Sequence, residues 1–502
     1  MMSPRRALLG AHLLALAAAG MLACAQLAGF ERVSVAAPDG GDAGDGGDVS
    51  DAGPVVLRCI WQWAPTSPGA GLLPAGITVT GDHAVWVGGT YGGQPQLAPK
   101  YGPLLAAAGP GASNSFLVRL DHHSGHVKWD QGWGAVDGGA HPLGAVAGEG
   151  DHVWVGGQTP AGTAVIAGDP SCAGAAQSPT GVAGYLAWFG LSGACGGTRT
   201  ADDATLEMVS DDQSQLWELG RTSAGMSLHA RYLSPAMDRS RAIDAAGVTP
   251  HALAARDGDV LIGGAFTGAL PSTGAPPQDT LTSTPNAYDA FVLAYHYDQN
   301  AITPLWAHRY PSALSASIGP SSAGAVGVAA ATEPDAGLAV FVAAPFPGGV
   351  QGLPGSISTQ ADRAILLERL DGATGSLLAI AAPFAAQVGD VQRVSALRAD
   401  LATGQLVLAG NFQGTIETTA GKIHSALGYD QGFLAVLDPG LGVRGVQTFD
   451  ATSGGIQIID AFVDAGFVLV VGIYSGSPSI DARCGPLPTA KGSIFAARLD
   501  LP

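Results

Sequence analysis

The sequence predicts an all-β protein: a single β-propeller of seven four-stranded blades. Two repeated patterns predict it. A short apolar run ending in Gly-Gly or a close variant recurs seven times, with its last residue at Gly89, Gly157, Gly220, Gly264, Ala344, Gly410 and Gly472. A second apolar run, ending in Leu-Asp, usually follows it, as at 116–121 and 433–438. The composition agrees, because 74 Gly and 33 Pro beside only 13% charged residues favour short strands and turns over helices.

Each repeat offers four candidate strands. The last residues of the first run are about 64 residues apart on average, which is long enough for four short strands and one enlarged loop. In the second repeat the candidates lie at 143–147, at 153–157, at 185–189 and after Cys195. The third repeat, at about 205–250, is short and its motif is degraded, so the sequence leaves open whether it forms a full blade.

The predicted strand at 57–63 precedes the first repeat and belongs to none of the seven. The fourth strand of a repeat follows Leu-Asp and carries Trp, as at 127–129 and 305–306, but the last repeat reaches Leu499-Asp500 without one. A strand of this type lies instead at 57–63. We expect it to complete the last blade, because that pairing removes two exposed sheet edges.

The cysteines support the same closure. Cys59, Cys172, Cys195 and Cys484 allow three pairings. Cys172 and Cys484 lie in the long loops of their repeats, and Cys195 and Cys59 lie in the corresponding fourth strands. These equivalent places predict the disulfides Cys172–Cys195 and Cys59–Cys484, which suit an exported protein.

The N-terminus indicates export. Residues 1–23 are predicted to be a signal peptide, with Arg5-Arg6 followed by an apolar run to residue 23. The sequence Met21-Leu22-Ala23-Cys24 resembles the bacterial lipobox, which implies lipid attachment at Cys24; the alternative is an ordinary cleaved signal. Ala25 resembles the residue that directs sorting to the outer membrane of Gram-negative bacteria. Residues 24–55 include an acidic Gly/Asp tract and predict a flexible linker, and residues 56–502 are the predicted propeller.

The repeats carry a family resemblance. Residues 289–293 (DAFVL) and the run 116–133, followed by 152–157, resemble the SBBP class of β-propeller repeats. The Phe-x-Gly steps at 266–268, 346–348 and 412–414 resemble those of predicted myxobacterial lipoproteins, and Kelch repeats are the second choice. The resemblance implies a propeller from about residue 56 to residue 500, and it implies no catalytic residue.

The residues that usually carry chemistry are sparse. A net charge of −18 argues against a nucleic-acid partner. The histidines of His122-His123-Ser124-Gly125-His126 could bind zinc or copper, but this segment aligns with the turns at 370–375 and 437–440, so we predict a solvated turn and no metal site. No Gly-x-Ser-x-Gly motif occurs, and the pairs Asp202-Asp203 and Asp211-Asp212 are interpreted as solvated turn residues. We therefore predict no catalytic residue and no cofactor.

The tryptophans follow the repeat. Trp86, Trp154 and Trp217 recur in second strands and Trp61, Trp129 and Trp306 in fourth strands, which predicts packing between blades. Outside that pattern lie three further tryptophans, which are the candidates for exposed aromatic side chains: Trp63, Trp133 and Trp188.

The predicted function is binding. The loops after the glycines join the same two strands of each repeat, so all should emerge on one face: 90–114, 158–184, 265–289, 345–363, 411–431 and 473–492. We expect a monomeric lipoprotein at the outer membrane or cell surface. Its membrane contact would be the lipid anchor alone, and its loop face would be a non-catalytic module for a protein or polysaccharide. The alternatives are a secreted propeller hydrolase or lyase acting on glycans, and a structural envelope protein with no discrete ligand.

Overall fold

The computed structural model describes residues between 57 and 501. The undescribed gaps within that range are 66–70, 102–103, 105–112, 135–141, 160–165, 168–182, 202, 212–214, 223–224, 233–237, 244–246, 272–279, 312–325, 334–336, 347–348, 351–356, 359–363, 385–389, 401–402, 419–420, 426–429 and 450–453. The predicted signal peptide, Cys24 and the linker up to residue 55 lie outside the described residues, as does Cys172. The described part of the chain is all-β and contains no helix, so none that could span a membrane.

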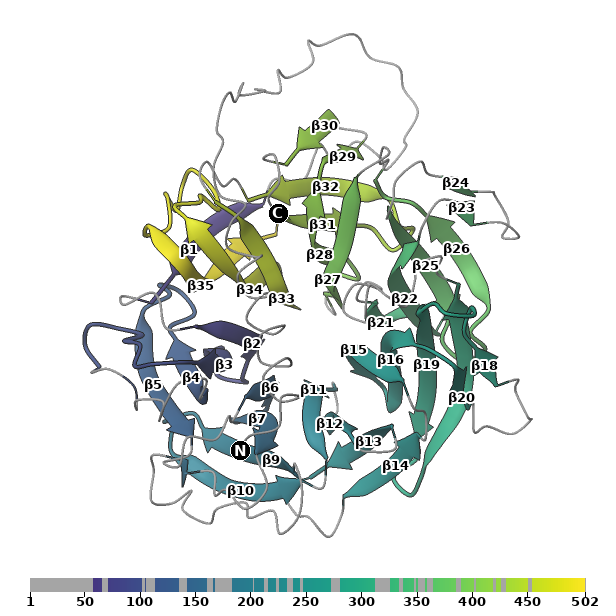
Figure 1. Ribbon diagram of the computed structural model, residues 1–502, viewed down its shortest axis with the longest axis horizontal. Coiled ribbons are helices and arrows are strands. Elements are labelled where there is room, and N and C mark those ends of the chain that lie inside the picture. The colour runs from purple at the N-terminus through teal and green to yellow at the C-terminus, as the bar shows by residue number, and fades with distance from the viewer. Residues whose placement is uncertain are drawn as a thin grey trace, which may run out of the picture. The chain divides into compact units, whose positions relative to one another are not determined.

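Most strands form antiparallel sets of four in chain order, which we call units (Figure 1). Unit one contains β2 (Leu73–Val79), β3 (Val85–Tyr91), β4 (Asn114–Leu120) and β5 (Val127–Gly134). Unit two contains β6 (Leu143–Glu149), β7 (His152–Thr159), β9 (Ala183–Gly190) and β10 (Cys195–Ala201). Unit three contains β11 (Ala204–Ser210), β12 (Leu216–Arg221), β13 (Met226–Arg231) and β14 (Arg239–Ile243). The short third repeat is therefore a complete four-stranded sheet.

The later units repeat this order. Unit four contains β15 (Val248–Arg256), β16 (Asp259–Phe266), β19 (Asp289–Tyr297) and β20 (Ile302–Tyr310). Unit five contains β21 (Gly327–Glu333), β22 (Gly337–Phe346), β25 (Ala364–Asp371) and β26 (Leu377–Ala381). Unit six contains β27 (Val391–Ala399), β28 (Leu406–Gln413), β31 (Gln431–Leu437) and β32 (Val443–Thr448). Unit seven contains β33 (Ile456–Asp464), β34 (Phe467–Gly476), β35 (Ala490–Asp500) and β1 (Arg58–Trp63), and a parallel bridge joins its β33 to β31.

The first strand of each unit packs against the first strand of the next. β2 contacts β6, the series continues through β11, β15, β21 and β27 to β33, and β33 contacts β2. Figure 1 shows these strands nearest the centre, with the later strands of each unit farther out. Four-stranded antiparallel sheets packed in this way around a common centre are the architecture of a β-propeller.

The recurring glycines make room for aromatic rings. The last glycine of the motif is paired with an aromatic residue of the third strand in five units: Gly89 with Phe116, Gly157 with Tyr185, Gly264 with Phe291, Gly410 with Phe433 and Gly472 with Phe495. A Cβ on any of these glycines would stand 2.6–2.8 Å from the ring. The same Cβ would also stand 2.1–2.6 Å from a carbonyl oxygen in or directly before the first strand, so the last glycine of the motif is a packing requirement of the second strand.

The fourth-strand tryptophans pack between units, as predicted. Trp61, Trp129 and Trp306 each lie against a glycine in the third-to-fourth-strand turn of the following unit: Gly125, Gly193 and Gly375. These glycines have φ values of 66°, 82° and 70°, and a Cβ there would lie within 3 Å of the indole. The indole nitrogen of Trp61 donates to the His122 carbonyl at 2.7 Å, and that of Trp306 donates to the Gly372 carbonyl at 2.7 Å. Trp86, Trp154 and Trp217 are fully buried.

The prediction of three exposed tryptophans is wrong for two of them. Trp63 and Trp133 are 7% and 1% exposed. Trp63 belongs to the core between units seven and one, and the Trp133 indole donates to the Tyr185 hydroxyl at 3.2 Å. Trp188 is half-buried, and its ring centroid lies 5.1 Å from that of Trp154. Residues that depart from the repeat are thus still used for packing between sheets.

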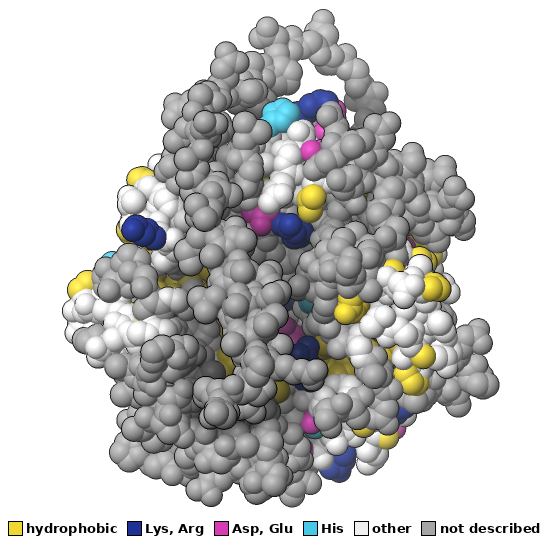
Figure 2. Space-filling view, in the orientation of Figure 1, with side chains coloured by type: hydrophobic (Ala, Val, Ile, Leu, Met, Phe, Trp, Pro, Cys, Tyr) yellow, Lys and Arg dark blue, Asp and Glu magenta, His cyan; other side chains and the backbone are white. Residues whose placement is uncertain are grey.

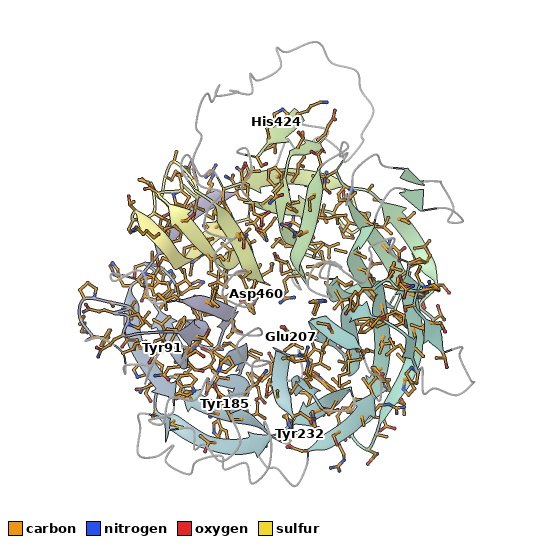
Figure 3. The ribbon with its side chains drawn as sticks, viewed as in Figure 1. Tyr91, Tyr185, Glu207, Tyr232, His424 and Asp460 are labelled. Carbon is orange, nitrogen blue, oxygen red and sulfur yellow. A yellow bond between two sulfur atoms is a disulfide. The ribbon has the colours of Figure 1, made fainter. Side chains whose placement is uncertain are left out.

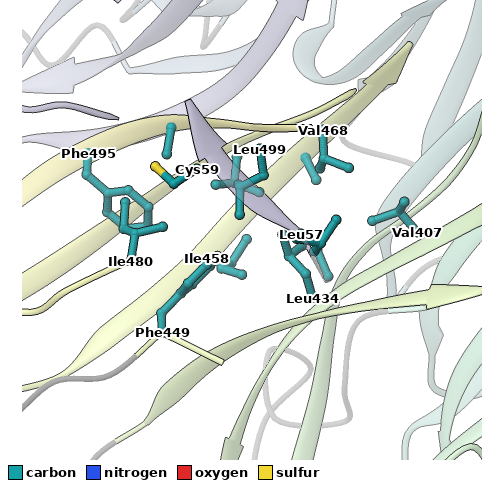
Figure 4. Close-up of a cluster of buried hydrophobic side chains, with 14 of the residues drawn as sticks. Leu57, Cys59, Val407, Leu434, Phe449, Ile458, Val468, Ile480, Phe495 and Leu499 are labelled. Atoms are coloured by element: carbon teal, nitrogen blue, oxygen red, sulfur yellow. The ribbon is translucent and has the colours of Figure 1, made fainter. Parts of the chain in front are cut away.

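The N-terminal strand lies where it was predicted. β1 pairs antiparallel with β35, from Arg58 opposite Asp500 to Trp63 opposite Ala496. The predicted disulfide Cys59–Cys484 is present, and Cys59 is buried among side chains of units six and seven (Figure 4). Cys195 is also disulfide-bonded; its predicted partner, Cys172, lies outside the described residues.

Candidate functional site

The connections between second and third strands carry the additions to the basic four-stranded unit. Three of them contain small ribbons: β17 (Ala269–Leu270) with β18 (Leu281–Thr282), β23 (Gly349–Val350) with β24 (Ile357–Ser358), and β29 (Thr415–Thr418) with β30 (Gly421–His424). A fourth contains β8 (Ile166–Ala167), which pairs with β5. Because every unit has the same strand order, all these connections leave from the same end of the units, which we call the loop face. Only residues 222–225 connect β12 to β13 in unit three.

Unit three also breaks the glycine–aromatic rule. Gly220 is paired with Ser227, where five other units have Phe or Tyr and unit five pairs Ala344 with Leu366. The space is filled by polar side chains, since a Cβ on Gly220 would lie 2.7 Å from Asp203 Cβ and 3.0 Å from Ser227 Oγ. His229 completes the group: its Nε2 lies 2.8 Å from Ser227 Oγ and 3.2 Å from Asp203 Oδ2. All three residues are buried.

The Asp203–Ser227–His229 group contains the residue types of a catalytic triad but not its hydrogen bonding. In a triad the Ser contacts one imidazole nitrogen and the Asp contacts the other. Here both contact Nε2, and the Ser227 hydroxyl also donates to Asp203 Oδ2. The hydrogen bond from His229, followed by that from Ser227, outweighs burial and lowers the pKa of Asp203. A charged Asp203 requires a proton on Nε2, so His229 donates and does not act as a base toward Ser227.

A buried charge network lies within unit three and is joined by one arginine of unit two. Glu218 is fully buried; its Oε2 accepts from Arg231 Nε at 2.5 Å, and its Oε1 accepts from Thr205 Oγ1 at 2.6 Å. Asp238 Oδ2 lies 3.2 Å from Arg231 Nη1 and 3.3 Å from Arg199 Nη1, so Arg199 links unit two to unit three. The apolar cluster at this boundary is small and contains Trp154 and Leu186 of unit two and Met208 and Leu216 of unit three.

Charged side chains also meet near the centre. Glu207 on β11 and Asp460 on β33 project toward it (Figure 3), and acidic, basic and histidine side chains are visible in the central hollow of the face shown in Figure 2. Asp460 Oδ1 lies 2.8 Å from Arg398 Nη2, and its Oδ2 accepts from the Ile77 amide at 3.2 Å, so it joins β27, β33 and β2. Burial and the charge of Asp460 raise the pKa of Glu207 to about 8, although Arg398 opposes the shift. Glu207 is thus predominantly protonated at neutral pH.

The histidine segment is a turn, as predicted, but it is not wholly solvated. It joins β4 to β5, and His123, Ser124 and His126 are exposed. His122 is half-buried: its Nδ1 lies 3.2 Å from Arg498 Nη1, and its ring centroid is 4.8 Å from that of Phe467. The described residues contain no group of three or more His, Cys, Asp or Glu side chains placed to hold a metal ion. His122 instead joins unit one to unit seven through its contacts with Arg498 and Phe467.

The interpretation of the acidic pairs as solvated turn residues is wrong for the two members that are described. Asp203 and Asp211 are 8% and 9% exposed. Asp211 Oδ1 accepts from the Gln215 amide at 2.8 Å, and its Oδ2 accepts from the Trp217 indole at 3.3 Å. Both aspartates satisfy buried donors of unit three.

No family model matches the sequence, and no curated protein matches it. Among solved structures, the chain is similar to BamB from Moraxella catarrhalis at 10% identity and a TM-score of 0.34, covering 89% of this chain and 94% of that one. It is similar to a chain of a mitotic checkpoint complex at 10% identity and a TM-score of 0.41, covering 89% and 98%. It is also similar to a gluconolactonase from Xanthomonas campestris at 13% identity and a TM-score of 0.29, covering 64% and 82%. All three TM-scores are below 0.5, so the functional proposals below rest on this chain's own residues.

Proposed function

We propose that this chain is an exported lipoprotein whose residues 56–502 form a closed, seven-bladed propeller. The pairing of β1 with β35, the disulfide Cys59–Cys484 and the contact between β33 and β2 support closure. Units one to seven would be the blades, with the N-terminal strand outermost in the last. This arrangement removes the two sheet edges that an open array would expose.

We further propose that the propeller is a non-catalytic binding or scaffold module that contacts a protein or polysaccharide through its loop face. The observation that carries this proposal is where the additions to the unit occur. The ribbons β17–β18, β23–β24 and β29–β30 all interrupt the second-to-third-strand connection. By contrast, the turns at the other end of the described units are short, such as 121–126 and 438–442. Insertions confined to one face are where repeat proteins place their binding surfaces.

The test compares the two faces. A bulky peptide is inserted at the tip of the β29–β30 ribbon, between Thr418 and Gly421, and in a matched variant at the β31–β32 turn beside Gly440. Each chain is immobilised and probed with cell-envelope extract and with purified glycans. We expect the parent chain and the Gly440 variant to retain the same ligand, and the ribbon variant to lose it. Retention of nothing by the parent chain, or equal binding by both variants, would contradict a loop-face module.

The anchor is a separate proposal about Cys24. We expect fatty-acid labelling of the chain in a Gram-negative host, and its loss in Cys24→Ser. Unchanged labelling of the variant would exclude lipid attachment at Cys24.

A further inference from the structure

Unit three has a short connection between its second and third strands at the loop face. The second-to-third-strand connection there is 222–225, whereas the corresponding connection is 92–113 in unit one and 267–288 in unit four. The end of β12 therefore carries no long insertion of its own unit. The side chains at that end are available to a ligand that reaches the loop face.

Arg221 is the last residue of β12 and is exposed. Within the described part of the chain its guanidinium makes no hydrogen bond or ion pair. Strand alternation places Arg221 on the same side of β12 as Trp217 and Leu219, which pack against unit four. Arg221 therefore extends toward the first strand of that unit.

His251 lies on that strand. It is the extra residue of the bulge in β15, between Pro250 and Ala252. The bulges of other first strands carry residues with no ionisable side chain at this place: Ala75, Gly144, Leu206, Ser395 and Ile459. An imidazole at this position is thus specific to unit four.

The His251 side chain has an unsatisfied nitrogen. Its Nε2 is buried and has no hydrogen-bond partner among the described residues. Burial, followed by the charge of Arg221, lowers the pKa of His251 to about 4, so the ring is neutral at physiological pH. A buried polar atom without a partner is costly, and a ligand oxygen that accepts from Nε2–H would remove that cost.

We propose that Arg221 and His251 bind a carboxylate group of the ligand at the loop face. The guanidinium is suited to bidentate contact with a carboxylate, and the neutral imidazole supplies one further donor. Asp203 adjoins Ala204, the residue paired with Arg221, but its carboxylate is occupied by Ser227 and His229 on the other side of the sheet. The positive charge of Arg221 therefore remains available.

The ligand class is a polysaccharide that carries carboxylates, such as a glycan containing uronic acid. This inference rests on the proposed binding role. The predicted contact loops are rich in Gly, Ser and Thr and poor in charge, which suits the hydroxyl groups of sugars. A net charge of −18 disfavours a densely anionic polymer, so isolated carboxylates on a polar chain fit best.

The experiment uses histidine-labelled chain and follows the His251 ring nitrogens by NMR during titration with galacturonate, with galactose as the uncharged match. We expect a saturable shift with galacturonate and none with galactose. In Arg221→Gln the affinity should fall about tenfold or more, the loss expected for one charge-assisted contact. Arg58→Gln removes an exposed arginine on the distant outer strand β1 and should leave the titration unchanged.

Three results would overturn the proposal: no response of His251, an equal response in Arg221→Gln, or a response to sulfate but not to galacturonate. Arg221 is exposed, so its variant should keep the parent spectrum elsewhere. Failure of this titration alongside ligand loss in the ribbon variant would contradict the carboxylate site and leave the loop-face module standing. A positive titration with equal binding by both insertion variants would support the carboxylate site and contradict the loop-face module.

Discussion

Removing the charge of Glu218 should destabilise the propeller strongly. Glu218→Gln preserves the size and shape of the side chain, so the change opens no cavity. It removes the anion that accepts from Arg231 Nε at 2.5 Å, and it places an amide NH2 against either Arg231 or Thr205, both of which donate. Breaking a buried ion pair from one side costs about 3–5 kcal/mol. In the variant Arg231 still has its second ion-pair partner, Asp238, at 3.2 Å. We therefore expect the free energy of unfolding to fall by an amount near the lower limit, about 3 kcal/mol.

The assay is urea unfolding monitored by tryptophan fluorescence, with the change in midpoint converted at constant m-value. Glu417→Gln is the matched control, because Glu417 pairs with Lys422 at 3.0 Å while 39% and 48% of their side chains are exposed. Its expected cost is below about 1 kcal/mol. In a double-mutant cycle with Arg231→Met, the two changes should be coupled by about 1–3 kcal/mol. A Glu218→Gln cost no larger than that of the control, or an additive cycle, would refute the assignment of unit three as a polar, charge-stabilised sheet.

Three further predictions concern packing and titration. Gly472→Ala places a Cβ 2.6 Å from the Phe495 ring and against the Gln457 carbonyl, so it should lower the free energy of unfolding by about 1–3 kcal/mol. A Cβ on the control, Gly492→Ala, would have no atom within 4 Å and should leave the unfolding midpoint unchanged. Equal losses of stability would contradict the glycine–aromatic rule. Trp61→Ala and Trp306→Ala remove equivalent buried indoles between units and should each lower stability by about 3–5 kcal/mol; a neutral result for Trp61 alone would mean that β1 does not pack on unit one. Glu207 has a pKa of about 8 in the folded protein and 4.5 in the unfolded chain, so the folded protein keeps a proton that the unfolded chain has released. The free energy of unfolding should therefore fall as the pH rises from 4.5 to about 8, and it should fall less in Glu207→Gln. An identical pH dependence of the two proteins would place Glu207 in solvent.

Most of the architecture follows from the sequence, because the repeat constrains every copy in the same way. The Gly-Gly and Leu-Asp runs predict the second and third strands, and the spare strand at 57–63 and Cys59 predict the pairing with β35. The fourth-strand tryptophans are predictable for the same reason: an indole that recurs at a fixed place in the repeat contacts the same turn of the next unit.

The polar residues of interest are not predictable in this way. Ser227 is noticeable only once its partner in the register, Gly220, is known, because the missing aromatic is the signal. His229 and Glu207 belong to the degraded third repeat. Asp203 lies 26 positions from His229, and the charges that act on Glu207 come from other units. The exposure predicted for Trp63 and Trp133 is wrong because packing between sheets uses faces that the repeat alone does not define.

The proposed closure of the ring depends on residues 57–63 completing the last unit. Peptide mapping of the exported chain by mass spectrometry without reduction tests it most directly. We expect a peptide containing Cys59 linked to one containing Cys484. A link from Cys59 to Cys172 or Cys195 would contradict it.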